Sequence, residues 1–397
     1  MGKMILSGKG RRWLLSGHPW VYADDVADGK GEPGELLPVE GPNGDELGWA
    51  LFSSSSKIAL RMVTRAPEQP NRAFWLTLVE RALSRRQRHG MLDPEGACRL
   101  ISGDADGLPG FILDRYGTVA VVQCGTQAAD RMRDFLLELV EEALPFPLTA
   151  VVDRSDTSVR RLENLETRSE LVRGSLPDEL LVREAEVLYE VDVLQGHKTG
   201  AYLDQSGNRA RAAEEVRGRG GRVLDAFAYD GLFGIHAALA GAEEVVCLEQ
   251  NQAACERIGR NAERNGVADR VRVEKANCMQ ELRARAEKGE RYGMAVVDPP
   301  AFARNRREAA GAERGYVELN RRAFALTEEG GAVVSASCSY NVRAEAFVKH
   351  LASAAHSAGA QVSLEALTGA SPDHPHLVTL PETQYLKCAF LRVYPAV

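Results

Sequence analysis

The sequence predicts an α/β protein with a small N-terminal β-barrel, a middle α+β domain and a C-terminal Rossmann-like domain. Short apolar runs separated by Gly, Pro and Asn occupy residues 1–66, which is typical of a small barrel. From residue 186 onward, short apolar runs alternate with helical segments, which favours a doubly wound parallel sheet. A chain of 397 residues is also too long for one ordinary domain. We therefore expect three domains, over residues 1–66, 67–185 and 186–397.

The first domain combines candidate strands with a basic and aromatic segment. The strands are expected over residues 34–39, 46–52 and 58–63. Ahead of them, residues 9–13 and 17–22 interleave basic and aromatic side chains, which suits phosphate contact and base stacking. The candidate RNA-binding residues in this segment are Arg11, Arg12, His18 and Trp20. Two other interpretations stay open, in which Trp20 is a core aromatic of the barrel and His18 belongs to a turn.

The other two domains are expected to contain helices and strands in a more regular order. In the middle domain we expect a helix from Asn71, as a cap, to Arg88, strands over 110–114, 118–123 and 148–153, and a helix over 130–143. In the C-terminal domain the apolar runs cover 223–226, 244–248, 271–274, 294–297 and 332–335, with helices over 252–265 and 316–327. Parallel strands of this kind carry their ligand at their carboxyl ends.

Composition restricts the class of protein. Hydrophobic residues make up 44% and charged residues 26% of the chain, and no run of eighteen apolar residues exists, so we expect no membrane span. The N-terminus lacks the apolar core of a signal peptide, and seven scattered cysteines suit a reducing cytoplasm. No Cys-x-x-Cys pair occurs, so no metal site is predicted. The net charge of −7 argues against a uniformly basic surface but leaves local basic patches open.

A candidate cofactor site follows the first strand of the C-terminal domain. The turn from Asp225 to Gly231 holds one glycine, whereas a dinucleotide fingerprint has three. Glu249 ends the next strand, where an acid can bind both hydroxyls of a ribose, and Asn277 after the third strand could contact an adenine edge. A ribose-binding acid without a phosphate loop fits S-adenosylmethionine (SAM) better than NAD or ATP. The alternative is an ordinary strand–helix turn with a solvent-facing Glu249.

A rigid acidic turn follows the fourth strand. In Asp298-Pro299-Pro300, two prolines fix the backbone and remove two amide donors, so the turn can hold a flat base edge-on. Asp298 would then bond a ring nitrogen or an amino group of the base. Taken alone, this turn favours methylation of an amino group, because that reaction needs no covalent step.

Cys338, which follows the fifth strand, changes this balance. A thiolate that adds to C6 of cytosine makes C5 nucleophilic enough to attack a sulfonium methyl group. Asp298 would stabilise the charge that develops at N3. The alternative for Cys338 is a buried thiol of the core.

Several motifs occur in a characteristic order along nearly the whole chain. They are Gly10-Arg11-Arg12, Gly17-His18-Pro19-Trp20-Val21, Arg154-Ser155-Asp156 with Glu163-Asn164-Leu165, Gly196 to Gln205, Asp298-Pro299-Pro300-Ala301-Phe302, Arg314-Gly315-Tyr316 with Asn320, and Ser337-Cys338-Ser339. Together they resemble the bacterial ribosomal large-subunit RNA methyltransferase I family, whose members make 5-methylcytosine in 23S rRNA. The resemblance implies a PUA-like RNA-binding domain over 1–66 and a class I SAM-dependent methyltransferase domain over 186–397.

The resemblance also implies roles for particular residues. Lys198, Tyr202 and Asp204 would help enclose the cofactor. The turn residues Asp225, Phe227, Tyr229 and Gly231 would line its methionine, Glu249 would take its ribose, Asn277 its adenine, and Asp298 and Pro299 would border it. Cys338 would be the nucleophile, with Asp298 as its catalytic partner. Phe302, Arg314 and Tyr316 would contact RNA.

The sequence departs from the family's pattern at some positions. Asn277 stands where Asp is usual, and Asp230 adds a negative charge near the expected sulfonium. Ala301 follows the prolines, so the base that removes the C5 proton is not identified. A related branch that makes 7-methylguanine carries Asn in place of Cys338. Methylation of another base nitrogen, a non-catalytic RNA-binding or ribosome-assembly module, and a homodimer formed through the middle domain all stay open.

Overall fold

The computed structural model describes residues 2–302 and 309–396. The chain divides into two compact units. The first unit comprises residues 1–182, 191–203 and 372–383, and the second comprises 183–190, 204–371 and 384–397. The predicted C-terminal domain therefore contributes two stretches, 191–203 and 372–383, to the first unit.

The N-terminal part of the first unit is a six-stranded sheet with its own apolar core, which includes Leu6, Val21, Leu37 and Leu60. Its strands are β1 (Met4–Leu6), β2 (Trp20–Tyr22), β3 (Val26–Gly29), β4 (Leu36–Glu40), β5 (Glu46–Phe52) and β6 (Ile58–Thr64), in the order β2-β6-β5-β4-β1-β3. Helix α1 (Gly8–Leu15) lies between the first two strands, and the hydroxyl of Ser7 caps it by accepting from the Gly10 amide at 3.0 Å. The strands predicted over 34–63 are all present.

The middle part of the first unit is a five-stranded sheet in the order β11-β10-β9-β8-β7. Its elements are α2 (Arg72–Arg88), β7 (Ala97–Ser102), β8 (Phe111–Tyr116), β9 (Val119–Cys124), α3 (Gln127–Ala143), β10 (Ala150–Asp153), α4 (Val159–Leu162) and β11 (Glu170–Gly174). The predicted cap of α2 is confirmed, because the Asn71 side chain accepts from the Phe74 amide at 3.0 Å. Strand β7 was not predicted. The two-stranded sheet of β12 (Leu181–Glu184) and β13 (Val187–Glu190) has most of its residues, 183–190, in the second unit.

The second unit is built on a seven-stranded sheet in the order β16-β15-β14-β17-β18-β20-β19. Its strands are β14 (Arg222–Ala226), β15 (Glu244–Glu249), β16 (Val271–Lys275), β17 (Tyr292–Val297), β18 (Thr327–Ser337), β19 (Ala360–Thr368) and β20 (Lys387–Pro395). The first five of these strands pair in parallel, and β20 runs antiparallel to both β18 and β19. The predicted doubly wound α/β fold is confirmed.

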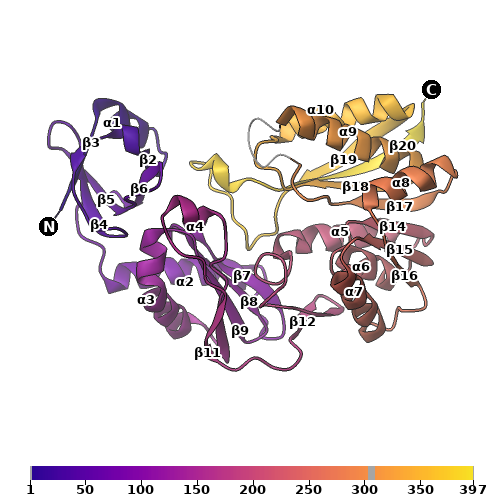
Figure 1. The fold of residues 1–397 in the computed structure, drawn as a ribbon, viewed down its shortest axis with the longest axis horizontal. Helices are drawn as coiled ribbons and strands as arrows, with labels where there is room; N and C mark the ends of the chain where they lie inside the picture. Colours follow the sequence, from indigo (N-terminus) through magenta and orange to yellow (C-terminus); the bar gives the residue numbers. More distant parts are fainter. Residues whose placement is uncertain (1, 303–308, 397) are drawn as a thin grey trace. The chain divides into compact units, whose positions relative to one another are not determined.

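Helices cover both faces of this sheet (Figure 1). One face carries α5 (Ser206–Val216), α6 (Leu232–Leu239) and α7 (Gln252–Arg264), and the other carries α8 (Cys278–Glu287), α9 (Ala309–Leu326) and α10 (Ala344–Ala358). The strand order reverses between β14 and β17, and ligands of such sheets bind outside the strand ends at this switch point.

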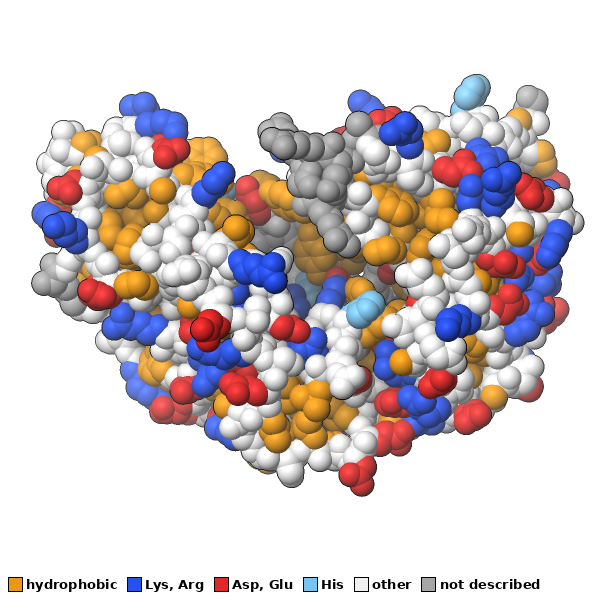
Figure 2. Space-filling model, viewed as in Figure 1, with side chains coloured by type: hydrophobic (Ala, Val, Ile, Leu, Met, Phe, Trp, Pro, Cys, Tyr) orange, Lys and Arg blue, Asp and Glu red, His pale blue; other side chains and the backbone are white. Residues whose placement is uncertain are grey.

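The surface is mixed in charge. Lys and Arg side chains alternate with Asp and Glu over the face shown in Figure 2. Within residues 2–302 and 309–396, no helix is long and apolar enough to cross a membrane. The same residues contain no group of His, Cys, Asp and Glu that could hold a metal ion.

Candidate active site

The predicted site residues of the second unit gather at one edge of its sheet. Ala226 at the end of β14 lies level with Leu248 of β15 on one side and with Val297 of β17 on the other. Val297 in turn pairs with Ser335 of β18. The segments that follow these residues therefore leave the sheet at the same edge, and they carry the turn after β14, Glu249, Asp298 and Cys338.

The turn between β14 and α6 holds its backbone in unusual conformations. Phe227 and Tyr229 have φ angles of 64° and 51°, a left-handed region in which side chains other than glycine are uncommon. Gly231 also has a positive φ of 73°, and a Cβ atom there would come within 2.7 Å of Ile258. Strain of this kind persists where surrounding contacts enforce it and is frequent at ligand sites. The turn therefore shows the strain expected of a ligand-binding loop.

Glu249 is fixed by backbone amides on both of its carboxylate oxygens. Oε2 accepts from the Tyr229 amide at 3.0 Å, and Oε1 accepts from the Gln250 and Asn251 amides at 2.8 Å each. These three bonds hold the side chain against the turn, so it is not the solvent-facing group of the alternative interpretation. Because a carboxylate has about four lone-pair directions, one remains for a ligand hydroxyl.

Two buried aspartates flank the same turn. Burial raises the pKa of Asp225 to about 7, although the Gly234 amide donates to it at 2.9 Å and favours the charged form. Burial likewise raises the pKa of Asp230 to about 7, against the opposing effect of its ion pair with Arg257. The negative charge of Asp230 is thus partly balanced by Arg257 and does not act on the expected sulfonium alone.

Asn277 has a structural role. It is exposed and caps α8, where its side-chain oxygen accepts from the Gln280 amide at 3.1 Å. A contact between its side-chain amide nitrogen and an adenine stays a prediction.

Asp298 ends a chain of side-chain hydrogen bonds. The Gln205 amide donates to Asp298 Oδ2 at 2.9 Å, and Asn208 donates to Gln205 Oε1 at 2.6 Å. Thr368 in turn donates to Asn208 Oδ1 at 2.7 Å. Gln205 and Asn208 are both buried, whereas Asp298 is half-buried. The two buried amides thus hold the carboxylate of Asp298 in one orientation. The sequence motif included Gln205 but did not assign it this role.

Cys338 lies between two serines that are tied to one tyrosine. The Ser337 hydroxyl donates to the Tyr316 hydroxyl at 2.8 Å, and the Tyr316 hydroxyl lies 2.9 Å from the Ser339 hydroxyl. The ring of Phe302 packs edge-on against Tyr316, with 4.9 Å between ring centroids. All seven cysteines lie in the described part of the chain, and Cys338 is the one that is not buried. A core thiol is therefore the weaker interpretation of this residue.

Tyr316 is fully buried, so it has no surface to offer RNA. The prediction that Tyr316 contacts RNA is wrong for this arrangement, because helix α9 turns the ring into the core. Arg314 on the same helix is exposed and Phe302 is half-buried, so an RNA contact at either of these stays a prediction.

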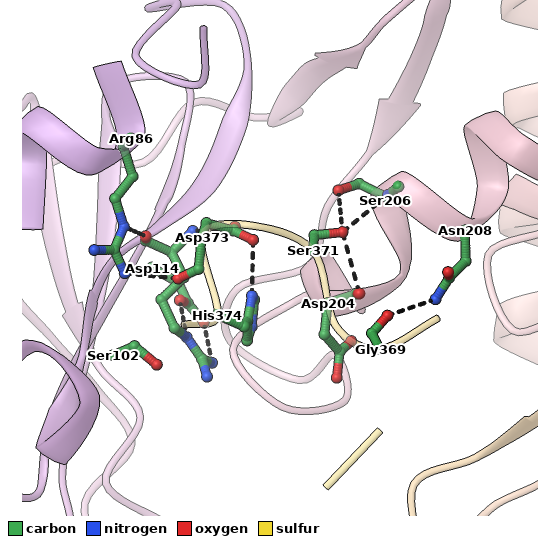
Figure 3. Close-up of polar contacts among 12 residues, drawn as sticks. Arg86, Ser102, Asp114, Asp204, Ser206, Asn208, Gly369, Ser371, Asp373 and His374 are labelled. Carbon is green, nitrogen blue, oxygen red and sulfur yellow. Dashed lines mark hydrogen bonds and ion pairs between the residues drawn. The ribbon is translucent and has the colours of Figure 1, made fainter. Parts of the chain in front are cut away.

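Asp204 belongs to a polar cluster of the second unit (Figure 3). Its carboxylate accepts from the Tyr385 hydroxyl at 2.7 Å, and its carbonyl accepts from the Ser371 amide at 2.9 Å. The Ser371 hydroxyl also accepts from the Gly207 amide at 2.8 Å. Asp204 is thus held between the start of α5 and the segment that follows β19.

Lys198 and Tyr202 lie in the first unit, as does the neighbouring Thr199. The Lys198 ammonium lies 4.3 Å from the centroid of the Tyr202 ring, and its backbone has a φ of 54°. Thr199 is buried and donates to Asp114 at 2.6 Å. The contact of Lys198 and Tyr202 with a cofactor stays a prediction.

The predicted RNA-binding residues of the barrel differ in exposure. Arg12 is exposed, and Arg11 is half-buried and pairs with Asp45 at 2.7 Å. His18 is buried, whereas the half-buried Trp20 donates its indole N–H to Asp104 at 2.7 Å. An RNA contact of His18 or Trp20 stays a prediction, as do the interpretations of Trp20 as a core aromatic and of His18 as a turn residue.

A different pair of aromatic residues faces solvent beside them. Trp13 and Tyr22 line an apolar hollow of about 580 Å³ together with Lys9, Arg12, Ser16 and Asp25. Trp13 stacks on His18 with ring centroids 4.7 Å apart. The interleaved basic and aromatic pattern covers this segment, but it does not show which ring points outward.

Comparisons with known proteins agree with this architecture. Residues 4–65 match a PUA-like domain family, and residues 210–335 match a family described as conserved hypothetical protein 95. Two solved structures share the fold at 18% identity, each aligned over 99% of this chain and 100% of its own. One is a protein complexed with SAH, with a TM-score of 0.83, and the other is a proposed SAM-dependent methyltransferase from Streptococcus mutans, with a TM-score of 0.82.

Relatives of known name align with nearly the whole chain. Ribosomal RNA large subunit methyltransferase I of Erwinia tasmaniensis is 34% identical over 98% of this chain and 99% of its own length. The protein of the same name from Serratia proteamaculans is 35% identical over the same shares, and that of Escherichia coli O157:H7 is 34% identical over 99% and 100%. The chain therefore belongs to the ribosomal RNA large subunit methyltransferase I family.

Proposed function

We propose that this protein transfers the methyl group of SAM to C5 of a cytosine in large-subunit ribosomal RNA. The observation that carries the proposal is the position of Asp298 and Cys338 at neighbouring strand ends, on the edge where Glu249 and the strained turn meet. The names of the relatives support ribosomal RNA as the substrate. An rRNA substrate would place the reaction in the cytoplasm, and homodimerisation stays a prediction.

The cofactor part of the site suits a nucleoside with a positive sulfonium. Glu249 would accept a ribose hydroxyl, and the turn from Asp225 to Gly231 would lie along the methionine. Lys198, Tyr202, Asp204, Asn277 and Pro299 are proposed as further contacts, from the resemblance alone. When bound, SAM supplies an electrophilic methyl group. Of the acidic groups on this edge, Glu249 and Asp298 would favour a cation, because negative groups stabilise a positive charge at short range.

In the proposed reaction, the Cys338 thiolate bonds to C6 of the cytosine, and the electrons of the C5–C6 double bond move onto C5 and N3. Asp298 in its protonated form would donate a hydrogen bond to N3 and so stabilise the negative charge there. C5 then takes the methyl group, and a base removes the C5 proton. The C5–C6 double bond re-forms as Cys338 leaves as a thiolate.

RNA would reach this site with the target base unstacked, which costs about a few kcal/mol and least in a loop. Arg12 and the hollow lined by Trp13 and Tyr22 are proposed to hold another nucleotide of the same RNA, since an aromatic face stacks on any base. Arg314 and Phe302, in the second unit, are proposed as further RNA contacts.

The test uses unmodified large-subunit rRNA and tritiated SAM, with the labelled nucleoside identified by digestion and mass spectrometry. We expect labelled 5-methylcytidine with the wild type and with Cys124→Ala, a buried thiol of the middle sheet that serves as the control. We expect none with Cys338→Ala. Label on a purine, or 5-methylcytidine from Cys338→Ala, would refute the thiolate mechanism.

A second experiment tests the covalent step itself. RNA with 5-fluorocytidine at the target position cannot lose a C5 proton, so the wild type should become covalently attached to it in the presence of SAM. Cys338→Ala should form no such adduct. Transfer of label without any adduct would favour methylation of a ring nitrogen.

A further inference from the structure

Lys387, at the start of β20, is a buried cation without a carboxylate partner. Lys387 is 4% exposed. Its ammonium donates to the Ser339 carbonyl at 2.7 Å and to the Tyr385 carbonyl at 2.8 Å. Among the described residues, no Asp or Glu lies within ion-pair distance of it. Lysine is almost never fully buried unless it is paired, so a negative partner is expected.

Cys338 is the group placed to be that partner. In the sheet register, Lys387 lies directly opposite Ser337, and its ammonium bonds the carbonyl of Ser339. Lys387 is thereby tied to both neighbours of Cys338, to Ser337 through the strand register of its backbone and to Ser339 through its ammonium. Burial lowers the pKa of Lys387 to about 8, and the charge of Cys338 acts in the opposite direction. An ammonium has three donors, and the two carbonyls use two of them.

We propose that Lys387 is a positioning residue that holds Cys338 as a thiolate, ready to attack the base. The proposal rests on the proposed function and extends it, since a thiolate and not a thiol is the nucleophile. It also gives a reason for the two carbonyl bonds, which fix the ammonium beside the thiolate.

Titratable rings near this pair include Tyr316 of α9 and His350 of α10, whose ring stacks on Tyr316 at 6.1 Å between centroids and whose pKa is lowered by burial from 6.5. Tyr316 from α9 has its pKa raised by burial, with further contributions from Cys338 and Asp298, so its phenol stays neutral. Asp298, after β17, acts on Tyr316, and Tyr385 bonds Asp204. An inflection of Cys338 reactivity above pH 6.5 would therefore report the pair of Cys338 and Lys387.

The experiment measures the alkylation rate of Cys338 by iodoacetamide between pH 5.5 and 9.5, without RNA or SAM. Peptide mass spectrometry separates Cys338 from the six buried cysteines. The variants are Lys387→Met, which keeps a similar length without charge, and Lys288→Met, an exposed lysine as the control. Methyl transfer to rRNA is measured on the same samples.

We expect a wild-type inflection below the ordinary thiol value of about 8.5. In Lys387→Met it should rise by about one pH unit or more, which slows alkylation at pH 7 about tenfold. Methyl transfer should show a lower kcat with an unchanged KM for SAM, whereas Lys288→Met should match the wild type. A wild-type inflection at or above 8.5 overturns the proposal even if Lys387→Met does not fold.

The two proposals fail in different ways. Ordinary thiol reactivity of Cys338 together with 5-methylcytidine formation would overturn the role of Lys387 alone. A reactive thiolate together with label on another base would overturn the proposed function. An unchanged inflection in folded Lys387→Met would mean that the ammonium serves another partner, such as an RNA phosphate.

Discussion

Replacing Asp225 with Asn tests how much the buried charge of this side chain destabilises the folded chain. Burial raises the pKa of Asp225 from 3.8 to about 7, so the folded chain holds a proton that the unfolded chain releases between these values. Folding stability from this group is therefore full below pH 3.8 and falls as the pH rises through about 7. The shift corresponds to a loss on the order of 4 kcal/mol at pH 8.

Asp225→Asn removes the charge and keeps an oxygen that can accept from the Gly234 amide, now 2.9 Å away. The new side-chain amide adds buried donors, which costs about 1–3 kcal/mol if they stay unpaired. We therefore expect the variant to be more stable than the wild type by about 1–3 kcal/mol at pH 8 and slightly less stable at pH 5.

The assay is urea unfolding at pH values from 5 to 8.5, followed by far-UV circular dichroism. Tryptophan fluorescence would report the wrong region, because all four tryptophans, Trp13, Trp20, Trp49 and Trp75, belong to the first unit. Asp230→Asn is the companion variant, since burial raises its pKa to about 7 as well. Wild type and Asp225→Asn curves that stay parallel over the whole pH range would refute the reasoning.

Three further predictions concern other parts of the molecule. Tyr316→Phe leaves the buried hydroxyls of Ser337 and Ser339 without their shared partner, so the free energy of unfolding should fall by about 1–3 kcal/mol. Methyl transfer should slow with an unchanged KM for SAM. Full activity would contradict the idea that Tyr316 positions the segment that carries Cys338. Burial opposes ionisation of Glu184, but Arg209 lowers the pKa of Glu184 to about 2. The stability that this carboxylate contributes is therefore present above pH 4.5 and lost as the pH falls toward 2. In Glu184→Gln the free energy of unfolding should depend less on pH in that window, as measured by circular dichroism. Trp13→Ala should weaken rRNA binding by about 1–3 kcal/mol in a filter-binding assay, whereas Trp20→Phe should change it little; the reverse order would show that the wrong ring was chosen.

The sequence predicted the C-terminal sheet well because its strands are short apolar runs at regular spacing. The central parallel strands β14, β15 and β17 are almost wholly buried, and strands covered on both faces are mostly apolar. Strand β7 escaped prediction because Arg99 interrupts it. In the structure Arg99 pairs with Asp114 of the neighbouring strand at 2.7 Å, a contact that no local pattern reveals.

Side-chain direction was the main quantity that the sequence could not supply. The segment with Trp13 and Trp20 was recognised, but the partner of Trp20 is Asp104, 84 residues further along the chain. Tyr316 belonged to a recognised motif, yet its burial depends on how α9 packs on the sheet. Both cases concern the position of a ring relative to distant elements, which a motif does not encode.

Lys387 did leave a signal in the sequence, namely a lone lysine at the head of the apolar run Lys387–Pro395. Its meaning depends on strand direction. The carboxyl end of β18 carries Cys338, and a parallel neighbour would place its own first residue at the opposite edge. Because β20 is antiparallel, its first residue pairs with Ser337 and brings an ammonium to the edge where the thiol lies. The antiparallel direction of β20 thus brings a positive charge to the edge where Cys338 lies. A strand parallel to β18 would carry its first residue at the opposite edge.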